Sequence, residues 1–414
     1  MSRNAVAITG LGVLSPIGQD LAALTASLRE SRSGVALIDA PPLHQRIPAG
    51  VIPHSFAEAF TPLERPFLDR CQQMAILAAR QAVQDAAFDD FASLGVRAGV
   101  HYGNVNGGVS TAQAWYQQLL VEGRQASRPF SAMAIMGNAG AAQISIRHRI
   151  HGPVITHASA CGSSGVAIAA AATAIADGHL DVAIAGGAEA PLTASLIGVF
   201  DGTRALAKPD PEDPSRTCKP FSRQRNGLVL GEGAAFLVLE SEQHARARGA
   251  RIHAWLAGSG IASDAHHIGM PAPEGQALSL REALRASGLP PRDIGYINAH
   301  ATATGGGDVI EAAAIRSVFG DGPDAPAVSS TKAVHGHLLG AASALEAVIT
   351  IAAIQASLLP ATAHLDDIDP ECNLNHVPGK AVTDHGIGAA LSFSCGFGGT
   401  NVALVFTSAG TPPP

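Results

Sequence analysis

Short apolar runs alternate along the chain with longer stretches in which apolar residues recur at helical spacing. The runs are rich in Val, Ile and Ala and predict strands, and the longer stretches predict helices. Several runs are apolar at every position, which is typical of strands covered on both faces of a sheet. The alternation predicts an α/β protein. The predicted strands are 5–12, 97–103, 153–158, 181–186, 233–240, 252–258, 294–299, 326–330, 388–395 and 401–407. The predicted helices are 69–87, 164–177, 275–287, 308–318 and 338–356.

A weak internal repeat indicates two similar halves. In each half a strand leads into an Ala-rich helix, and a strand, a glycine turn and another strand follow later in the chain. The polar segment "ESEQHARARGAR" separates the two copies, so we divide the chain into 1–245 and 246–414. A duplicated α/β protein is expected to hold its site between the halves. The repeated segments are 155–177 and 227–240 in the first half, and 327–354 and 388–406 in the second.

Composition and charge narrow the classes of partner. The chain has 414 residues, of which 47% are hydrophobic, so it can bury a large core. Its formal net charge is −7 and it has no long Lys or Arg block, which argues against nucleic acid and membrane surfaces as partners. The apolar segments 164–177 and 338–356 are rich in Ala or interrupted by polar residues, so neither is a good membrane span.

The N-terminal segment and the cysteines predict a cytoplasmic protein. The stretch "MSRNAVAITGLGVLSPIG" is a poor match to a signal peptide, because glycines and a proline break its apolar run. The five cysteines are an odd number and show no paired spacing. We therefore expect reduced thiols in the cytoplasm.

One cysteine stands between a predicted strand and a predicted helix. In the first turn of that helix, Cys161 would face unsatisfied backbone N–H groups and the positive end of the helix dipole, which favour the thiolate. Gly162 and Gly165 would allow a tight turn and the close approach of a substrate, and the N–H of Cys161 could point at an oxyanion beside the sulfur. On this stretch alone, a buried structural cysteine is an equally good interpretation.

Two histidines occupy comparable positions. His300 closes the predicted strand "IGYINAH", and His337 lies in "SSTKAVHGHLLGAASALE" at the expected start of a helix. Strand ends and helix starts are the places where α/β proteins gather catalytic groups. The chain has 17 His and most histidines are structural, so the positions of these two, rather than their type, make them candidates.

These residues carry a resemblance to a known family. "SACGSSG", "NAHATATGGGD", "SSTKAVHGHLLGAASALE" and "GFGGTN" resemble the nucleophile, first-histidine, lysine–histidine and glycine-loop motifs of β-ketoacyl-acyl carrier protein synthases, in their elongating Cys-His-His branch. Further matches, in the same order, are "VAITGLGVLSPIG", "AGGAEA", "RTCKPFSRQRNGLVLGEGAAFLVLE" and "LPATAHLDDID". The resemblance covers essentially the whole chain, and several motifs in register make it specific.

The resemblance implies a fold and a reaction. The fold is a duplicated, five-layer αβαβα arrangement of the thiolase superfamily. Cys161 would take an acyl group from a carrier-protein thioester, and His300 and His337 would assist decarboxylation of a malonyl thioester and stabilise the enolate that attacks the acyl-Cys161 carbonyl. Two neutral imidazoles can donate hydrogen bonds to the enolate oxygen. The product is a 3-oxoacyl thioester two carbons longer, made in fatty acid or in type II polyketide or polyene biosynthesis.

The resemblance also implies supporting residues around this centre. Lys332 and Glu346 match charged residues of the family and would order the histidines, although a structural ion pair is nearly as good an interpretation. In the glycine loop, the N–H of Phe397 would join that of Cys161 as the oxyanion hole. The glycines of that loop would let it move as a gate, unless it is a simple tight hairpin; they are Gly396, Gly398 and Gly399.

Substrate and partner residues follow from the same motifs. Thr302 and Thr304 match hydroxyls that bind the phosphopantetheine arm, and Phe200 falls where the family often has an acyl-pocket aromatic. No cofactor is implied, because the substrates arrive on the phosphopantetheine of acyl carrier protein. The implied assembly is a dimer, either a homodimer or a heterodimer with a related ketosynthase-like subunit. Three arginines match the family's carrier-docking face, although solvated surface arginines are an equally good interpretation; they are Arg65, Arg70 and Arg204.

Departures from the family pattern bear on the substrate more than on the reaction. The usual "HGTST" is here "HATAT", with Ala301 and Ala303 in place of Gly and Ser, and "GGG" replaces a following Pro. Cys395 stands where a bulky aromatic is common beside the gate. These changes would reshape the mouth of the site, so a specialised polyketide or polyene synthase stays open beside a fatty acid role.

Other interpretations are weaker. A non-catalytic partner subunit of the chain-length-factor type would lack the nucleophile, whereas Cys161 and both histidines are present. A thiolase would use a cysteine in a "CxGGG"-like loop, which the Cys395 segment echoes only faintly. His335 and His337 make a poor metal set because no carboxylate or cysteine ligand is near them in the sequence. The glycine spacing of the first strand also misses the dinucleotide-binding fingerprint.

Overall fold

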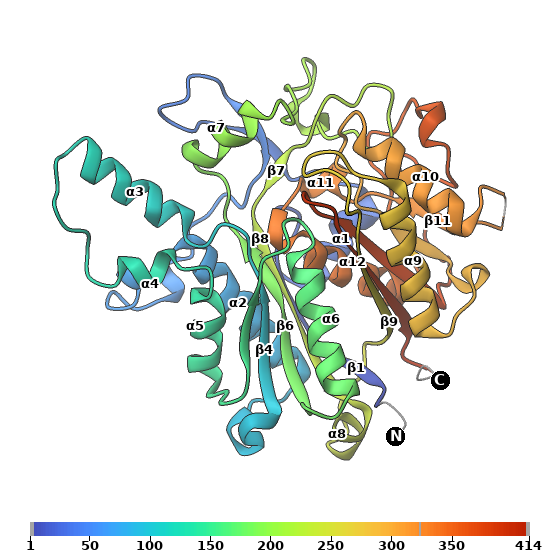
Figure 1. The fold of residues 1–414 in the computed structure, drawn as a ribbon, viewed down its shortest axis with the longest axis horizontal. Coiled ribbons are helices and arrows are strands. Elements are labelled where there is room, and N and C mark those ends of the chain that lie inside the picture. The colour runs from blue at the N-terminus through green and yellow to red at the C-terminus, as the bar shows by residue number, and fades with distance from the viewer. Residues whose placement is uncertain (1–3, 323, 411–414) are drawn as a thin grey trace.

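Ten strands form one mixed sheet that runs through both halves of the chain (Figure 1). The computed structural model describes residues 4–322 and 324–410. Outward from the centre, the strands of the first half lie in the order β1-β8-β6-β4-β5, and those of the second in the order β9-β13-β12-β10-β11. The central strands β1 and β9 are antiparallel neighbours. The first-half strands are β1 (Val6–Leu14), β4 (Ala98–Gly103), β5 (Val154–His157), β6 (Val182–Glu189) and β8 (Gly233–Ser241). The second-half strands are β9 (Ala254–Ser263), β10 (Tyr296–Asn298), β11 (Ala327–Ser329), β12 (Ala389–Cys395) and β13 (Thr400–Ser408).

The two halves repeat one another. We number the five sheet strands of each half in chain order. Strands with the same number then lie at the same place in the sheet, counted outward from its centre. The pairing directions also correspond: β4 is parallel to β5 and β6, as β10 is to β11 and β12, whereas β8 and β13 run antiparallel to their neighbours. The predicted α/β fold with two pseudo-duplicated halves is confirmed.

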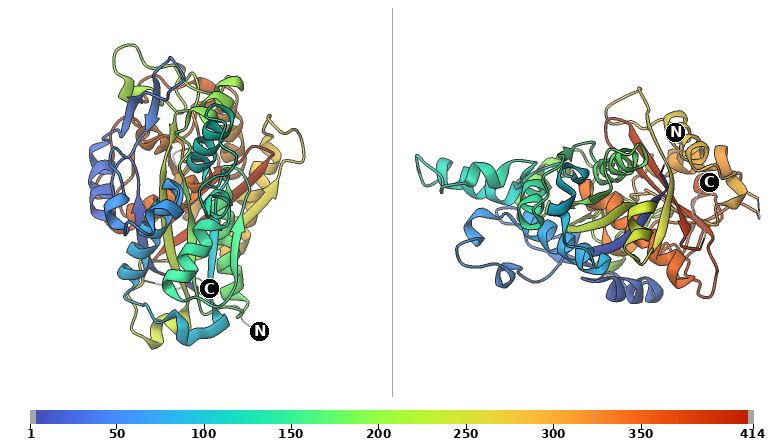
Figure 2. Two further views of the ribbon diagram at one scale, coloured as in Figure 1. Left: turned by 90° about the vertical axis from the view of Figure 1, so that its left-hand side faces the viewer. Right: turned by 90° about the horizontal axis from the view of Figure 1, so that it is seen from below.

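Helices form three layers around the two halves of the sheet (Figures 1 and 2). On one outer side, α2 (Arg70–Ala86) and α5 (Ala139–His148) pack against strands of the first half. On the other, α9 (Pro273–Ser287) and α10 (Gly307–Phe319) pack against the second half. Between them lie α6 (Ser163–Ala176) and α12 (Ala342–Ala356), which contact strands of both halves. This is the five-layer αβαβα order implied by the resemblance.

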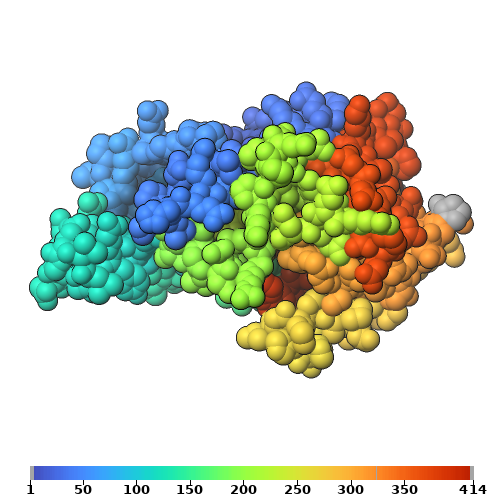
Figure 3. Space-filling view, turned by 90° about the horizontal axis from the view of Figure 1, so that it is seen from above, coloured from blue at the N-terminus to red at the C-terminus, as the bar shows by residue number. Residues whose placement is uncertain are grey.

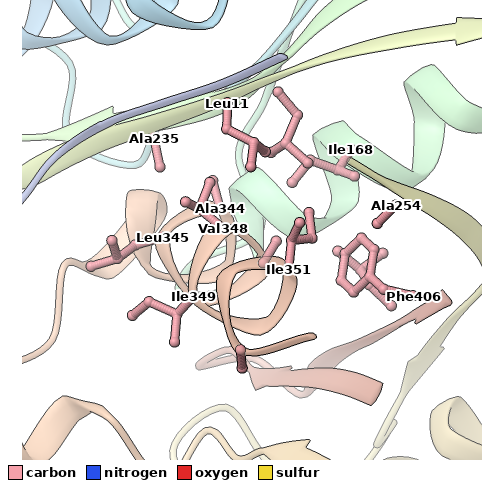
Figure 4. Packing of buried hydrophobic residues seen from close by; sticks show 14 of the residues in the cluster. Leu11, Ile168, Ala235, Ala254, Ala344, Leu345, Val348, Ile349, Ile351 and Phe406 are labelled. Atoms are coloured by element: carbon pink, nitrogen blue, oxygen red, sulfur yellow. The ribbon is translucent and has the colours of Figure 1, made fainter. Parts of the chain in front are cut away.

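The central layer holds the largest hydrophobic cluster. Leu11 and Ile168 of the first half meet Val348, Ile351 and Phe406 of the second in this cluster (Figure 4). Every residue of α12 from Ala342 to Ile354 is buried. The window Leu339–Ala356 is long and apolar enough to cross a membrane, but 89% of it is buried inside the protein, as in the core helix of a globular fold.

Close packing in this layer explains one glycine and corrects a prediction. A Cβ at Gly165 would lie 2.8 Å from Val402 Cγ1 and 3.0 Å from Ser343 Cβ, so the glycine lets α6 approach α12 and β13. Gly162 has an ordinary helical φ of −85° and its nearest such contact is 3.4 Å away. The prediction that both glycines make room for a substrate is wrong, because Gly165 makes room for neighbouring side chains of the second half.

Two further details differ from the sequence prediction. The segment 227–240 is not the counterpart of 388–406, because its first strand, β7 (Leu230–Gly231), pairs with β3 in a separate three-stranded sheet. The counterpart of β12 is β6. The helix predicted over 338–356 begins at Ala342, and a 3-10 turn (Leu339–Ala341) precedes it.

Several elements were not predicted from the sequence. They are α1 (Leu21–Glu30), β2 (Val35–Ile38), β3 (Ile47–Gly50), α3 (Val109–Leu120), α4 (Ser131–Ile135), α5 (Ala139–His148), α7 (Ala194–Gly202), α8 (Glu242–Ala247) and α11 (Lys332–His335). Further short 3-10 segments are Ala57–Ala59, Arg65–Phe67, Phe91–Arg97, Pro214–Arg216, Pro291–Asp293 and Pro370–Cys372.

Candidate active site

Cys161 lies in the connection between β5 and α6. Ala160 before it has a left-handed backbone with φ of 49°, and Gly162 after it caps the helix, which begins at Ser163. The side-chain hydroxyl of Ser343 in α12 donates a hydrogen bond to the carbonyl oxygen of Cys161 over 3.1 Å. The second half of the chain therefore fixes the turn that carries the cysteine. The sequence analysis placed Cys161 in the first turn of the helix, whereas the structure places it just before the helix.

His337 is in direct contact with this cysteine. Its Nε2 atom lies 2.9 Å from Cys161 Sγ. The backbone on both sides of the histidine is held by β7: the His337 N–H donates to Val229 O over 2.7 Å, and the Gly231 N–H donates to His337 O over 2.9 Å. His337 follows α11 and precedes the 3-10 turn before α12, so the predicted position at a helix start is off by one turn.

His300 completes the cluster from the end of β10. The Cys161 sulfur and one ring nitrogen of each histidine lie within 4.8 Å of one another. The two imidazole rings meet edge to face, with centroids 5.3 Å apart. The carboxylate of Glu311 in α10 accepts the N–H groups of His300 over 2.6 Å and of Ala301 over 2.7 Å. The structure therefore brings together all three residues that the sequence singled out as catalytic.

Burial sets the protonation of these groups. Desolvation, with a smaller contribution from the positive charge of Lys332, holds the pKa of both histidines well below the usual 6.5, so both imidazoles are neutral. Burial also raises the pKa of Cys161 to about 11, although Lys332 and backbone N–H groups act in the opposite direction. The prediction that the position of Cys161 favours the thiolate is therefore wrong for the free cysteine: desolvation outweighs the groups that lower its pKa, and the cysteine is a thiol.

Lys332 and Glu346 form an ion pair behind the histidines. Lys332 Nζ donates to Glu346 Oε1, and both side chains are fully buried. Ser394 Oγ donates to the other carboxylate oxygen over 3.3 Å. Burial raises the pKa of Glu346, against the attraction of Lys332. The pair joins α11 to α12, the two elements on either side of His337. Its ordering role stays a prediction.

The glycine loop between β12 and β13 covers the cysteine. The backbone N–H groups of Phe397 and Cys161 both act on the Cys161 sulfur and stabilise its thiolate. Gly398 and Gly399 have φ values of 84° and 82°, which glycine adopts readily. The loop is tied to the segment after β9, because the Asp264 N–H donates to Gly399 O over 2.8 Å. The N–H groups of Phe397 and Cys161 thus both lie beside the sulfur, and their role as an oxyanion hole stays a prediction.

One side of Cys161 is apolar. The cysteine belongs to a buried cluster with Ala40, Ala194, Ile197, Leu228, Leu230 and Leu339. Phe200 of α7 packs against this cluster, and its role as an acyl-pocket aromatic stays a prediction. Viewed from above, the surface is hollowed between the lime-coloured chain near α7 and the yellow chain that follows β9, and red-coloured chain lies in the hollow (Figure 3).

The predicted pantetheine residues follow His300 directly. Thr302 is 8% exposed, and its hydroxyl donates to that of Thr304 over 3.3 Å. The guanidinium of Arg225 holds this segment by donating to Thr304 O over 3.2 Å and to Gly305 O over 2.8 Å. The two hydroxyls are thus held between the histidine and the surface.

The three predicted docking arginines differ in their surroundings. Arg65 and Arg204 are exposed. Arg70 is partly buried, and its guanidinium makes two hydrogen bonds, of 2.6 and 2.8 Å, to the buried carboxylate of Glu232. The geometry therefore favours Arg65 and Arg204 over Arg70 as docking groups.

Sequence reasoning missed three residues that shape the site. Ser343 and Glu311 hold the backbone at Cys161 and His300, and Asp308 accepts the Ala303 N–H over 3.1 Å. Asp308 and Glu311 stand three residues apart in a predicted helix after the histidine motif, so both carboxylates face one side of it. That spacing was a usable signal. Ser343 had no comparable signal, because its contact with Cys161 is purely tertiary.

Comparisons with known proteins agree with this geometry. The N-terminal domain of the beta-ketoacyl synthase family matches residues 3–245, and the C-terminal domain of that family matches residues 253–366. The chain is 38% identical over 412 residues to 3-oxoacyl-[acyl-carrier-protein] synthase 2 of Staphylococcus aureus (strain COL), covering 98% of this chain and 99% of that protein.

A second relative and a solved structure have more specialised names. The chain is 38% identical over 408 residues to nodulation protein E of Rhizobium meliloti (strain 1021), covering 98% of this chain and 99% of that protein. The solved structure of the ishigamide ketosynthase/chain length factor superposes with a TM-score of 0.91 at 34% identity, covering 99% of this chain and all of that chain. The chain therefore belongs to the β-ketoacyl synthase family and is an acyltransferase of that family.

Proposed function

We propose that this chain is a 3-oxoacyl-[acyl carrier protein] synthase that joins an acyl group on Cys161 to a malonyl group with loss of carbon dioxide. The observation that carries the proposal is the buried cluster in which the Cys161 thiol contacts His337 and lies within reach of the neutral His300. A chain-length-factor-like subunit is a poorer interpretation, because all three groups are present. No bound cofactor is required, since the acyl groups arrive on carrier protein.

In the first half-reaction, Cys161 takes the acyl group. His337 Nε2 accepts the thiol proton as Sγ attacks the thioester carbonyl, which removes the need for a free thiolate. The N–H groups of Cys161 and Phe397 stabilise the oxyanion. The carbonyl then re-forms, the bond to the pantetheine sulfur breaks, and that sulfur leaves with the proton held by His337. The imidazole is neutral again at the end of this step.

In the second half-reaction, a malonyl thioester loses carbon dioxide. The electrons of the broken carbon–carbon bond form an enolate, and the neutral imidazole of His300 donates an N–H hydrogen bond to its oxygen. His337 donates a second one once its proton lies on Nε2, which is the tautomer opposite to the one that accepts the thiol proton. The enolate carbon attacks the acyl-Cys161 carbonyl, the carbonyl re-forms as the bond to the cysteine sulfur breaks, and the thiolate that leaves takes up one proton from solvent. The low pKa values of the histidines suit this step. A neutral imidazole donates a hydrogen bond to the enolate oxygen and keeps its proton, so the enolate carbon stays nucleophilic.

Removal of His300 tests the division of labour. We expect His300→Ala to accumulate acyl-Cys161 while 3-oxoacyl product and carbon dioxide release fall by at least about a hundredfold, in the range of positioned acid–base groups. The measurement is product and carbon dioxide formation from acyl and malonyl carrier proteins, with intact mass of the enzyme. Unchanged carbon dioxide release would contradict the assignment.

The pathway is either fatty acid or type II polyketide or polyene biosynthesis. The apolar cluster beside Cys161 and Phe200 suits a hydrocarbon chain. Ala301 and Ala303 replace the larger or more flexible residues of the usual motif, and Ala303 is buried with a left-handed φ of 66°. Competition among saturated, unsaturated and polyene acyl carrier proteins distinguishes the pathways, since the preferred donor should be the one the pocket fits.

The partner that delivers substrates is an acidic acyl carrier protein, which docks at Arg65 and Arg204. We expect Arg65→Glu and Arg204→Glu to raise KM for carrier-bound substrate while they spare transfer from a small thioester. Arg292→Glu is the matched control, because Arg292 is exposed next to the short 3-10 turn before β10. Equal effects on carrier-bound and small thioesters would contradict docking.

The dimer forms along the free edge of the sheet. β5 is the outermost strand of the first half, and Val154 and Ile155 on it are 39% and 42% exposed. Beyond it, α3 projects from the body (Figures 1 and 2) and has no buried residue. Exposed apolar side chains nearby in the sequence are Tyr116, Leu120, Val121, Phe130, Met133 and Met136.

A second copy is the proposed occupant of this edge, and a related ketosynthase-like subunit is the alternative. The molar mass of the purified chain in solution distinguishes the two. A dimer of the chain alone supports the homodimer, whereas a monomer that dimerises only with a related subunit supports the heterodimer.

The five cysteines are free, so we place the assembly in the reducing cytoplasm.

A further inference from the structure

The three reacting side chains also form a set of metal ligands. A thiol sulfur and two imidazole nitrogens lie within 4.8 Å of one another, and Cys161, His300 and His337 are 7%, 9% and 2% exposed. Across residues 4–322 and 324–410, no other group of three such side chains brings its ligand atoms this close. Cysteine and histidine in this number are the donors that Zn²⁺ prefers in three-ligand sites with an open fourth position.

Metal binding at this cluster is coupled to the loss of a proton. The thiol must release its proton to bind, because the thiolate is the ligand. One proton per metal ion is therefore released to solvent, and affinity rises with pH.

The geometry needs only a small adjustment. Zn²⁺ lies about 2.3 Å from a thiolate and about 2.0–2.1 Å from an imidazole nitrogen, which separates tetrahedral ligands by roughly 3.3–3.6 Å. The 2.9 Å contact between His337 Nε2 and Cys161 Sγ must widen slightly, and the widest separation, up to 4.8 Å, must narrow. The sulfur–nitrogen contact must lengthen by roughly 0.7 Å, and the widest separation must shorten by at most about 1.5 Å.

Two features make the site weaker than a structural metal centre. The Nδ1 atoms of His300 and His337 are buried without a hydrogen-bond partner among the described residues, whereas resident metal sites usually fix that atom with a carboxylate or a carbonyl. The positive charge of Lys332 also repels a bound cation, although its ion pair with Glu346 reduces that repulsion. The site therefore suits reversible binding.

We propose that the unacylated active site is an inhibitory Zn²⁺ site, in which Cys161, His300 and His337 are the protein ligands. A bound ion occupies the sulfur and both imidazoles, so it blocks acyl transfer and malonyl decarboxylation together. Acylation removes the thiolate ligand, so a loaded enzyme is protected. The inference uses the same side chains as the proposed function but does not depend on it, because metal binding is measured directly.

Titration calorimetry with Zn²⁺ and absorption spectroscopy with Co²⁺ test the site on the intact chain. We expect one equivalent of Zn²⁺ bound with release of one proton, seen as a dependence of the heat on the buffer, and a thiolate-to-cobalt charge-transfer band. Cys161→Ser should lose the band, and His300→Ala and His337→Ala should each weaken binding at least about tenfold. His266→Ala/His267→Ala is the control, because it removes an exposed histidine pair outside the cluster.

The outcomes separate this proposal from the proposed reaction. Binding by Cys161→Ser as tight as by the unchanged chain, or a cobalt spectrum without the thiolate band, overturns the zinc site. Thermal unfolding of each variant shows whether it is folded, and alkylation of Cys161 in the unchanged chain gives the same test without a substitution. Zinc bound at the cluster of a chain that forms no 3-oxoacyl product would refute the reaction but not the site.

Discussion

Burial opposes ionisation of Cys161, so in the proposed mechanism His337 serves as the base that removes the thiol proton. The pKa of the thiol is raised to about 11, so little thiolate is present before substrate binds. The 2.9 Å contact to His337 Nε2 lets the proton move as the sulfur attacks. Reactivity at this residue is therefore a property of the pair, and it depends on whatever holds His337 and His300 in place.

Glu311 is predicted to position His300 for decarboxylation. Its carboxylate accepts two consecutive backbone N–H groups, at His300 and Ala301. Glu311→Ala frees that backbone, and a displacement of about 1 Å at a reacting group costs roughly a hundredfold in rate. We expect condensation to fall by about that factor, with a much smaller effect on Cys161 acylation. Single-turnover assays of each step check this.

The conservative variant is the control for Glu311. Glu311→Gln retains one carbonyl acceptor, so it should recover part of the condensation rate. Equal losses in acylation and condensation would show that Glu311 supports the fold as a whole rather than the position of His300.

Position and motif were enough to identify Cys161, His300 and His337 from the sequence. Their partners were harder to identify, because a hydrogen bond such as that from Ser343 to the Cys161 carbonyl joins residues that are far apart in the chain. The raised pKa of Cys161 was also missed. It results from burial by both halves, and a sequence pattern does not show the depth of burial.

At the level of elements, the contact between α6 and α12 places the two halves of the site together. Gly165→Ala introduces a Cβ 2.8 Å from Val402 Cγ1 and 3.0 Å from Ser343 Cβ. Overpacking of a tight core costs about 1–3 kcal/mol. We expect the denaturant midpoint of unfolding to fall accordingly, and acyl transfer to fall as well because Ser343 shifts. Equilibrium unfolding in urea measures the change.

Gly162→Ala is the matched control in the same segment. Its nearest contact is 3.4 Å away and its φ suits alanine, so it should cost distinctly less stability than Gly165→Ala. If the two variants lose the same stability, close packing of α6 is not the reason for Gly165.

The ten sheet strands were predicted from the sequence because they read as short apolar runs, and several of them are buried along their whole length. Helix α3 was missed since none of its residues is buried, so its sequence lacks a core-facing stripe. Strand β7 was misassigned to the main sheet, because two residues carry no signal of the sheet they join.

For the whole molecule, buried titratable groups predict a stability maximum close to pH 6.5. Burial lowers the pKa of His101 to about 4 and of His335 to about 3, from 6.5. The unfolded chain then binds protons that the folded chain excludes, so stability falls as the pH drops below 6.5. Other histidines with lowered pKa act in the same direction; they are His148, His157, His300, His337, His364 and His376.

Buried carboxyl groups act on the alkaline side. Burial raises the pKa of Glu189 to about 7 and of Glu311 to about 8, so the folded chain keeps protons that the unfolded chain releases. That stabilisation is lost as the pH rises through those values. The thermal unfolding midpoint, measured across this range, should fall on both sides of its maximum. A midpoint that rises steadily through pH 8 would contradict this account.

The duplication was predicted from a faint repeat, and the sheet shows why it was recognisable. Corresponding strands of the halves occupy the same place in the order of the sheet, so both copies keep apolar runs in the same order. The layer order followed from the resemblance rather than from the pattern, since periodicity does not show which face of a sheet a helix covers.

The central claim is that Cys161 carries the acyl group that is then extended. Intact-mass spectrometry of the chain, mixed with a panel of acyl carrier proteins and then with malonyl carrier protein, tests it most directly, with Cys161→Ala as the control. The account predicts one acyl adduct on the unchanged chain, none on the variant, and its conversion into a 3-oxoacyl thioester two carbons longer on malonyl addition. An adduct that forms equally on Cys161→Ala, or that is never extended, would contradict it.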